Sequence, residues 1–209
     1  MKIAAYVFDW SGVVSDDRMP VYTANMMLFD HFGLPRITFE QWQERSTLTA
    51  AEILKNHGAN ADPDTIRNMY REFYAEVVKG GMRPSVYPDA VEMLKAMANR
   101  ALKLAVMSSH PEEHLLDEAA QYGVKGMFAH IMGSVTDKAK MLADMPQIMD
   151  VPLEDMFYVG DTIYDAEAAE AVGMKFVARI GGYHSEGRLL GKKHALAVRN
   201  LAELAEPIE

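Results

Sequence analysis

Two apolar segments from opposite ends of the chain each run directly into a carboxylate. Residues 3–8 are followed by Asp9. Residues 156–160 are followed by Asp161, and Asp165 comes one helical turn later. In a parallel α/β sheet, ligands bind at the carboxyl ends of the strands, next to the point where the strand order reverses. Carboxylates gathered there could supply a nucleophile and also ligands for Mg²⁺, which binds carboxylates together with water and substrate phosphate oxygens.

Asp9 could act as a nucleophile toward phosphorus. It precedes Ser11 and Gly12, where the backbone can approach a ligand closely. A carboxylate that attacks phosphorus forms an aspartyl-phosphate and divides one difficult displacement into two easier ones. The same pattern also fits an Asp that caps a turn at a strand end. Asp161 and Asp165 likewise fit acids at a helix N-terminus, where they interact favourably with the helix dipole.

Two further polar residues could hold a phosphate group. Ser108 follows the apolar residues 104–107, and its hydroxyl with neighbouring N–H groups could bind a phosphate oxygen. A serine at a strand end is also a common turn former. Lys138 could hold phosphate charge and fix the nucleophile as a compact cation, although lysines are common on surfaces. We add Gly12 and Ser109 as expected substrate-binding residues.

The composition excludes several classes of protein. The chain has 209 residues, 49% of them hydrophobic, a net charge of −9 and no cysteine. This charge would repel a phosphate backbone, so we expect no nucleic-acid partner. Asp9 comes too early for the apolar region of a signal peptide, and no run approaches the ~20 apolar residues that span a membrane. We therefore expect a cytoplasmic protein with no membrane segment. The sequence does not indicate its oligomeric state.

The pattern of short apolar runs predicts an α/β fold. The expected strands are residues 3–8, 103–107, 130–133, 156–160 and 175–180. From the second run onward they alternate with helical segments, which indicates βαβ units and a parallel sheet. One helix is expected to begin with a capping box at Ser109 and to end near Gln121. Another is expected over residues 162–172, ended by Gly173.

A helical insertion is expected between the first and second strands. Residues 18–80 contain several helical patterns and no convincing strand. A connection this long within a compact sheet should be a structured insertion rather than a loop. We predict a helical cap domain of residues 17–81 over the carboxyl ends of the strands, with a hinge at residues 80–81. Residues 1–16 and 82–209 would form the core domain.

Four of these elements together resemble the motifs of the haloacid dehalogenase (HAD) superfamily of phosphotransferases. Residues 9–14, Asp-Trp-Ser-Gly-Val-Val, are similar to the first motif, whose leading Asp is the nucleophile. Ser108 and Lys138 are similar to the second and third motifs. Residues 160–165, Gly-Asp-Thr-Ile-Tyr-Asp, are similar to the fourth. The helical insertion resembles the C1 cap of the phosphoglycolate phosphatase and phosphonatase subfamily. The resemblance implies a Rossmann-like parallel sheet of strand order 5-4-1-2-3, a Mg²⁺ cofactor and a small phosphorylated substrate.

The chain departs from that pattern at Ser11. Phosphatases of the superfamily carry a second Asp at this position, which protonates the leaving group and then activates water. A hydroxyl cannot act as a general acid near neutral pH, and such catalysis is typically worth about 10²–10⁴-fold. The backbone carbonyl of Ser11 could still bind the metal. The metal ligands implied by the resemblance are therefore Asp9, Ser11, Asp161 and Asp165.

Three explanations of this serine stay open. The first is a phosphatase that favours good leaving groups, or one that takes its proton from Asp16, Asp17 or His110. The second is another hydrolase branch. The Asp-Trp-x-Gly opening is similar to that of phosphonoacetaldehyde hydrolases, which use a cap lysine to form a Schiff base. In this chain the candidate for that lysine is Lys55. Dehalogenases also lack the second Asp, but they lack an equivalent of Asp161 as well. The third is a phosphate-binding protein with little turnover.

The helical cap is expected to determine substrate choice, as it does in C1-capped relatives. Arg45 in the cap could bind a second anionic group of the substrate, although a solvated helix face would give the same pattern. Arg188 and residues 192–194 read as a surface loop. We expect a Mg²⁺-dependent hydrolase that acts on a small phosphorylated metabolite through an aspartyl-phosphate on Asp9.

Overall fold

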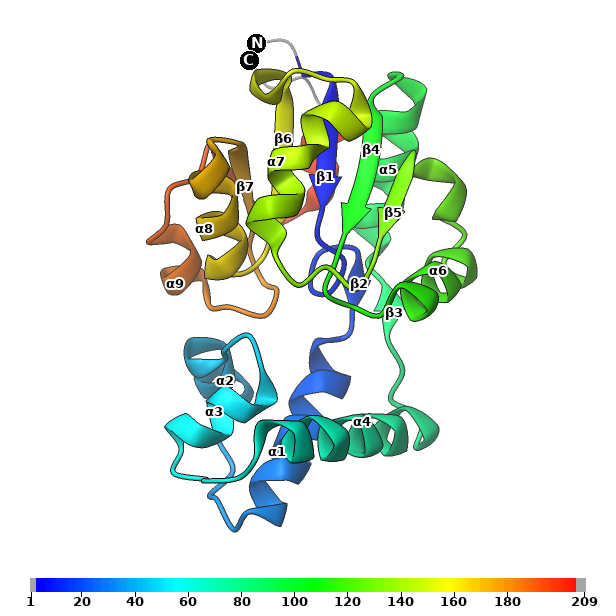
Figure 1. Cartoon of the computed structure of the whole chain (residues 1–209). Helices are drawn as coiled ribbons and strands as arrows, with labels where there is room; N and C mark the ends of the chain where they lie inside the picture. The colour runs from blue at the N-terminus through cyan, green and yellow to red at the C-terminus, as the bar shows by residue number, and fades with distance from the viewer. Residues whose placement is uncertain (1–2, 206–209) are drawn as a thin grey trace.

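A computed structural model describes residues 3–205 of the chain (Figure 1). The strands are β1 (Ala5–Phe8), β2 (Ser15–Asp16), β3 (Ser85–Val86), β4 (Lys103–Met107), β5 (His130–Met132), β6 (Met156–Gly160), β7 (Lys175–Arg179) and β8 (Leu196–Val198). The α-helices are α1 (Arg18–His31), α2 (Phe39–Arg45), α3 (Ala50–Asn56), α4 (Pro63–Lys79), α5 (Pro88–Asn99), α6 (Glu112–Gln121), α7 (Lys138–Met149), α8 (Ile163–Val172) and α9 (Glu186–Leu190). Short 3₁₀ turns are η1 (Lys125–Met127), η2 (Leu153–Asp155) and η3 (Leu201–Ala205).

The main sheet is parallel and has the order β5-β4-β1-β6-β7-β8. Numbered as the five predicted strands and read from the β7 side, this is the order 5-4-1-2-3, so the predicted fold class and strand order are confirmed. The sequence did not predict β8, which pairs with β7 at the edge of the sheet. Arg188 was predicted to lie in a surface loop, but it lies in α9.

Helices cover both faces of the sheet, as the alternation of side chains along β1 requires. Tyr6 and Phe8 point into the apolar cluster beneath α5 and α6. Ala5 and Val7 point into the opposite cluster beneath α7 and α8. Strands buried on both faces read as continuous apolar runs, which is why residues 3–8 were recognisable in the sequence.

Helices α1–α4 form a layer of their own beyond the carboxyl ends of the strands (Figure 1). They enclose a separate apolar cluster that includes Phe29, Trp42 and Ile53. The chain enters and leaves this layer side by side, because β2 and β3 pair antiparallel at its two connections. The division into a core of residues 1–16 and 82–209 and a cap of residues 17–81 stays our proposal. Its outer limits include residues 1–2 and 206–209, which lie outside the described part of the chain.

Helix ends show what local sequence can and cannot specify. Helix α8 begins after Thr162 and ends at Gly173, as predicted. Helix α6 ends at Gln121 as predicted, but its expected capping box at Ser109 is wrong, because the helix begins only after Pro111. The hydroxyl of Ser134, from a loop beyond β5, accepts a hydrogen bond from the N–H of the first helical residue instead. Within residues 3–205, no helix is both long and apolar enough to cross a membrane.

Candidate active site

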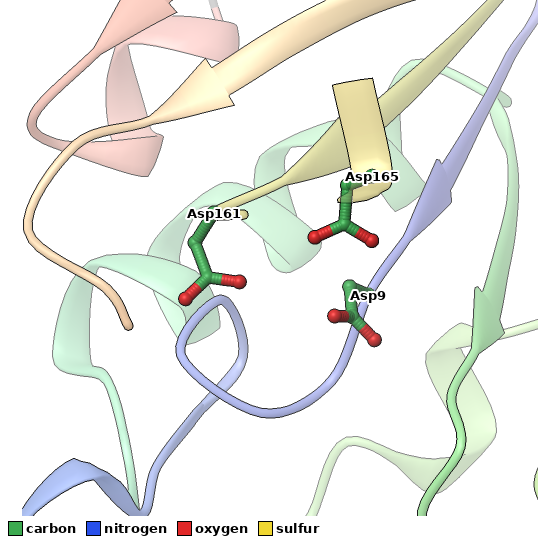
Figure 2. Close-up of side chains that lie close together, drawn as sticks. All are labelled: Asp9, Asp161 and Asp165. Atoms are coloured by element: carbon green, nitrogen blue, oxygen red, sulfur yellow. The ribbon is translucent and has the colours of Figure 1, made fainter. Parts of the chain in front are cut away.

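Three buried aspartates from two strand ends and one helix face one another at the carboxyl edge of the sheet (Figure 2). Asp9 follows β1, Asp161 follows β6, and Asp165 lies in the first turn of α8. One carboxylate oxygen from each lies within 4.8 Å of those of the other two. The sheet explains this meeting, since β1 pairs with β6 in register from Ala5 to Phe8. The backbone N–H of Asp9 extends the pairing by donating to the carbonyl oxygen of Val159 at 2.9 Å.

Lys138 joins two of these carboxylates. Its Nζ donates to Oδ2 of Asp9 at 2.8 Å and to Oδ1 of Asp165 at 2.6 Å. The residue begins α7, whose N-cap Asp137 accepts from the N–H of Lys140 at 2.9 Å, so the lysine position is fixed by helix capping. Burial by itself would lower the pKa of Lys138, but the two carboxylates raise it overall, so the ammonium stays charged.

Asp165 is held as a carboxylate by several donors. The Thr162 hydroxyl donates to its Oδ2 at 2.5 Å, and the Tyr158 hydroxyl donates to its Oδ1 at 2.6 Å. Burial alone would raise the pKa of Asp165, yet Lys138, Thr162 and Tyr158 together hold it below the ordinary value. A side chain at Gly160 would collide with Asp165, because a Cβ there would lie 2.4 Å from the Asp165 Cβ.

Asp161 lacks enough hydrogen-bond donors for its two buried carboxylate oxygens. Its Oδ2 accepts from the N–H of Tyr183 at 2.5 Å, whereas its buried Oδ1 has no hydrogen-bond partner within residues 3–205. Gly12 and Gly182 allow the backbone to approach closely, since a Cβ on either would lie 2.1 Å from Oδ2. Burial and the neighbouring carboxylates raise the pKa of Asp161 well above its ordinary value. A hard cation would give the unpartnered Oδ1 a ligand and would offset the repulsion among the buried carboxylates. The residues therefore fit Mg²⁺, which prefers oxygen ligands.

Asp9 is positioned by its neighbours. The N–H of Trp10 donates to its Oδ1 at 2.8 Å, and Lys138 holds its Oδ2. Burial raises the pKa of Asp9 to about 6, although Lys138 and the Trp10 N–H act in the opposite direction. Near pH 7 the carboxylate is therefore largely ionised, as a nucleophile must be.

Ser108 lies at the same edge of the sheet as Asp9. Strand β4 pairs with β1, with Val106 opposite Phe8. Ser108, which directly follows β4, therefore lies beside the start of the first motif at Asp9. It is buried, and its hydroxyl accepts from the N–H of His110 at 3.2 Å. Ser109 is exposed, and its assignment to substrate binding stays a prediction.

The position that lacks the expected Asp has another carboxylate beside it. Asp17 is 4% exposed and receives hydrogen bonds from the side chains of Ser11 and Tyr183. Burial raises its pKa to about 7, against the effect of these two donors. Asp16 instead forms a two-point ion pair with Arg18, in which both N···O distances are 2.8 Å. Of these two residues, the structure brings Asp17 to Ser11 and keeps Asp16 engaged elsewhere.

His110 lies near a different carboxylate. Its Nε2 lies 3.6 Å from Oε1 of Glu118, and Oε2 of the same carboxylate accepts from the Trp10 indole at 2.6 Å. Burial lowers the pKa of His110, although Glu118 raises it. The lowered pKa favours the neutral imidazole at neutral pH.

The expected cap residues do not lie among these buried groups. Arg45 is exposed in the last turn of α2, and Lys55 is exposed on α3. The sequence reasoning also missed Tyr183, which lies against Gly12 and donates to Asp161. The two glycines at 181–182, directly after a predicted strand, were the one local signal for a close backbone approach there.

The chain belongs to the haloacid dehalogenase-like hydrolase family, whose profile matches residues 6–179. It is 26% identical over 215 residues to a phosphoglycolate phosphatase of Chromobacterium violaceum, covering 97% of this chain and 95% of that protein. It is 24% identical over 213 residues to phosphoglycolate phosphatase 1 of Pseudomonas aeruginosa, covering 95% of this chain and 77% of that protein. The expected family and hydrolase class are thereby confirmed.

Solved structures agree on the fold. A conserved haloacid dehalogenase-like protein from Agrobacterium tumefaciens superimposes with a TM-score of 0.80 at 16% identity, over 97% of this chain and 96% of the other. A haloacid dehalogenase-like family hydrolase from Streptococcus pneumoniae gives a TM-score of 0.71 at 19% identity, over 97% and 96% of the two chains. At these identities the likeness establishes the shared fold alone.

Proposed function

We propose that this protein is a Mg²⁺-dependent phosphatase that acts on a small phosphorylated metabolite through an aspartyl-phosphate on Asp9. The observation that carries the proposal is the environment of Asp9. One of its oxygens is held by Lys138 at 2.8 Å, the other accepts from the Trp10 N–H at 2.8 Å, and the side chain is buried. A residue that only shaped a turn would not need a buried ammonium and two further aspartates beside it.

In the proposed reaction an oxygen of Asp9 attacks phosphorus, and the bond from phosphorus to the ester oxygen breaks. Water then attacks the aspartyl-phosphate, which releases inorganic phosphate and restores Asp9. Lys138 keeps Asp9 oriented and adds positive charge beside the transferring group, and the Ser108 hydroxyl would hold a phosphate oxygen.

A bound Mg²⁺ would be held by Asp9, Asp161, Asp165 and the backbone carbonyl of Ser11, and it would neutralise phosphate charge. The unpartnered Oδ1 of Asp161 supports this assignment. The proposed role of Lys138 does not depend on the metal, since Lys138 already contacts both Asp9 and Asp165.

Because Ser11 stands where a general acid is usual, no Asp at this position protonates the oxygen of the leaving group. The enzyme should therefore favour esters whose leaving groups depart without protonation. Phosphoglycolate is the natural first metabolite to assay, because it is the substrate named for the relatives. The cytoplasmic location and the absence of a nucleic-acid partner stay predictions from composition.

The experiment is phosphate release from p-nitrophenyl phosphate and acetyl phosphate, with and without Mg²⁺, by the native protein and by Asp9→Asn. Release that requires Mg²⁺ and is lost in the folded variant is the expected result. Retention of most activity in Asp9→Asn would remove this residue as the nucleophile.

The two alternatives have their own readouts. A binding protein with little turnover would release phosphate from neither compound but would still be stabilised by inorganic phosphate. If the protein were a phosphonoacetaldehyde hydrolase, borohydride would trap the substrate on Lys55 by reducing the Schiff base. The exposed position of Lys55 does not favour this second alternative, because a Schiff-base lysine needs a desolvated site.

A further inference from the structure

Asp17 is the first residue of the segment that leads into the helical layer, and its side chain is used in an unusual way. It is the N-cap of α1, yet its carboxylate makes no capping hydrogen bond to the helix. An Asp at an N-cap ordinarily accepts from the N–H groups of the first turn. Here the side chain is buried, and its Oδ1 has no hydrogen-bond partner within residues 3–205. The carboxylate is therefore held away from its usual local role with one oxygen free.

One tyrosine, Tyr183, shares a hydrogen bond with this carboxylate, and three more tyrosines interact with it electrostatically. The Asp17 carboxylate raises the pKa of Tyr70 and Tyr74 of α4, of Tyr122 after α6, and of Tyr183 after β7, so the four phenols lie within its electrostatic range. Tyr70 and Tyr74 stack with ring centroids 6.0 Å apart and stay partly exposed. We call Asp17 with these four tyrosines the tyrosine cluster.

Three cations near the active site are engaged with other partners. Arg18 pairs with Asp16 and donates to the carbonyl oxygen of Gly181. Arg188 donates to the carbonyl oxygens of Gln43 and Ser46 at 3.0 and 3.1 Å. Lys138 is held by two aspartates of the active site. In the part of the chain that the structure describes, none of these cations pairs with Asp17.

We propose that the tyrosine cluster binds a positively charged amino group of the substrate, so that the preferred substrates are phosphate monoesters of amino alcohols. This inference rests on the proposed phosphatase function. The free oxygen of Asp17 supplies an acceptor, and a bound ammonium group would favour the ionised form of this buried carboxyl group. Aromatic rings bind ammonium groups through their negative faces. Asp17 contacts Ser11 of the first motif, which places the cluster next to the reacting end of the substrate. A carboxylate at that place, as in phosphoglycolate, would be repelled by Asp17.

The test uses three phosphates of similar length whose far end is positive, neutral or negative: O-phosphoethanolamine, ethyl phosphate and phosphoglycolate. Each is measured as a competitive inhibitor of p-nitrophenyl phosphate hydrolysis, so that slow turnover of an alkyl ester does not matter. We expect Ki for phosphoethanolamine to be about tenfold or more below Ki for ethyl phosphate, and Ki for phosphoglycolate to be the highest. Equal Ki values, or tightest binding of phosphoglycolate, would overturn the proposal while the phosphatase function stands. Absence of any p-nitrophenyl phosphate hydrolysis would instead count against the function itself.

Variants assign the preference to the cluster. In Asp17→Asn the Ki ratio of ethyl phosphate to phosphoethanolamine should fall to within about twofold of one. The matched control is Asp62→Asn, since Asp62 is the exposed N-cap of α4, and here the ratio should not change. Tyr74→Leu should lower the ratio about threefold, whereas Tyr74→Phe, which keeps the ring, should preserve it. If Asp17→Asn does not fold, the two Tyr74 variants decide, and an unchanged ratio in Tyr74→Leu would contradict the proposal.

Discussion

Nζ of Lys138 lies 2.8 Å from Oδ2 of Asp9, although the two residues are 129 positions apart in the chain. The contact joins the start of α7 to the end of β1 across the carboxyl edge of the sheet. Both side chains are largely buried, and water therefore screens their attraction weakly. The ammonium also reaches Asp165, so one cation compensates two of the three buried carboxylates.

Replacing Lys138 with methionine should affect catalysis and stability together. We expect kcat to fall by about 10²–10³-fold, because a preorganised cation beside the transferring group is lost. The free energy of unfolding without Mg²⁺ should fall by about 3–5 kcal/mol, since two buried carboxylates lose their partner. Steady-state kinetics and urea unfolding measure the two effects. Lys140→Met, at an exposed position of the same helix, is the control and should change neither. Native-like values for both quantities in Lys138→Met would show that the ion pair is incidental.

Asp161→Asn should have effects of opposite sign with and without metal. Without Mg²⁺ the variant should be more stable by about 1–3 kcal/mol, because a buried carboxylate with an unpartnered oxygen is neutralised. The native protein should gain about 2.7 kcal/mol of stability at a Mg²⁺ concentration 100 times its Kd, and the variant should not. Thermal unfolding with EDTA and with Mg²⁺ measures both. Asp144→Asn, at an exposed site on α7, should behave like the native protein. A full Mg²⁺ response in Asp161→Asn would exclude this residue as a ligand.

The sheet and its order were predictable because buried parallel strands leave continuous apolar runs, as in residues 3–8 and 156–160. The edge strand β8 was missed because it is short and two of its three residues are only partly buried. The start of α6 was misjudged for a different reason. Its cap is supplied by Ser134, which is 22 positions away from the N–H it accepts, and no local pattern reports such a contact.

The positions of the aspartates could be expected from the sequence, but their electrostatic differences could not. Asp161 and Asp165 are four residues apart, yet the pKa of one is raised and that of the other is lowered. The difference comes from Lys138, Thr162 and Tyr158, whose side chains donate hydrogen bonds to Asp165 and not to Asp161. Tyr183 and Asp17 meet only because a loop after β7 returns over the first motif, which again is a consequence of the complete fold.

The absent acid should appear in the dependence of rate on the leaving group. We expect kcat/KM for aryl and acyl phosphates to exceed that for simple alkyl phosphates by about 10²–10⁴-fold, because alkoxides need a proton to depart and phenolates do not. A series of phenyl phosphates with graded leaving-group pKa measures the slope. A rate independent of this pKa would mean that another residue supplies the proton efficiently.

Restoring the acid should require two substitutions. Ser11→Asp alone would place a second carboxyl beside Asp17, and the two groups would compete for one proton. We expect less than about a tenfold gain on ethyl phosphate from the single change, and about 10–100-fold from Ser11→Asp with Asp17→Asn. Asp17→Asn alone is the control and should give no gain. Equal activity of the single and double variants would show that Asp17 does not influence a carboxyl at this position.

His184 should make the protein less stable in mild acid. It is 2% exposed, its Nδ1 accepts from the N–H of Ile163 at 3.0 Å, and burial, aided by Arg188, lowers its pKa to about 4. An unfolded histidine has a pKa near 6.5, so between about pH 6.5 and 4 the unfolded state binds the proton and the native state does not. Stability from this residue is therefore complete above that window and is lost as the pH falls through it, by up to about 3 kcal/mol.

Urea unfolding of the native protein and of His184→Asn, at intervals from pH 7.5 to 4.5, tests this expectation. The asparagine keeps an acceptor for the Ile163 N–H but does not titrate, so the difference in unfolding free energy between the two proteins should shrink as the pH falls. Taking the difference matters, because the raised pKa values of Asp9 and Asp17 act in the opposite direction in both proteins. His194→Asn, at an exposed position, should follow the native curve. A constant difference between His184→Asn and the native protein across this range would mean that His184 is not held neutral in the folded state.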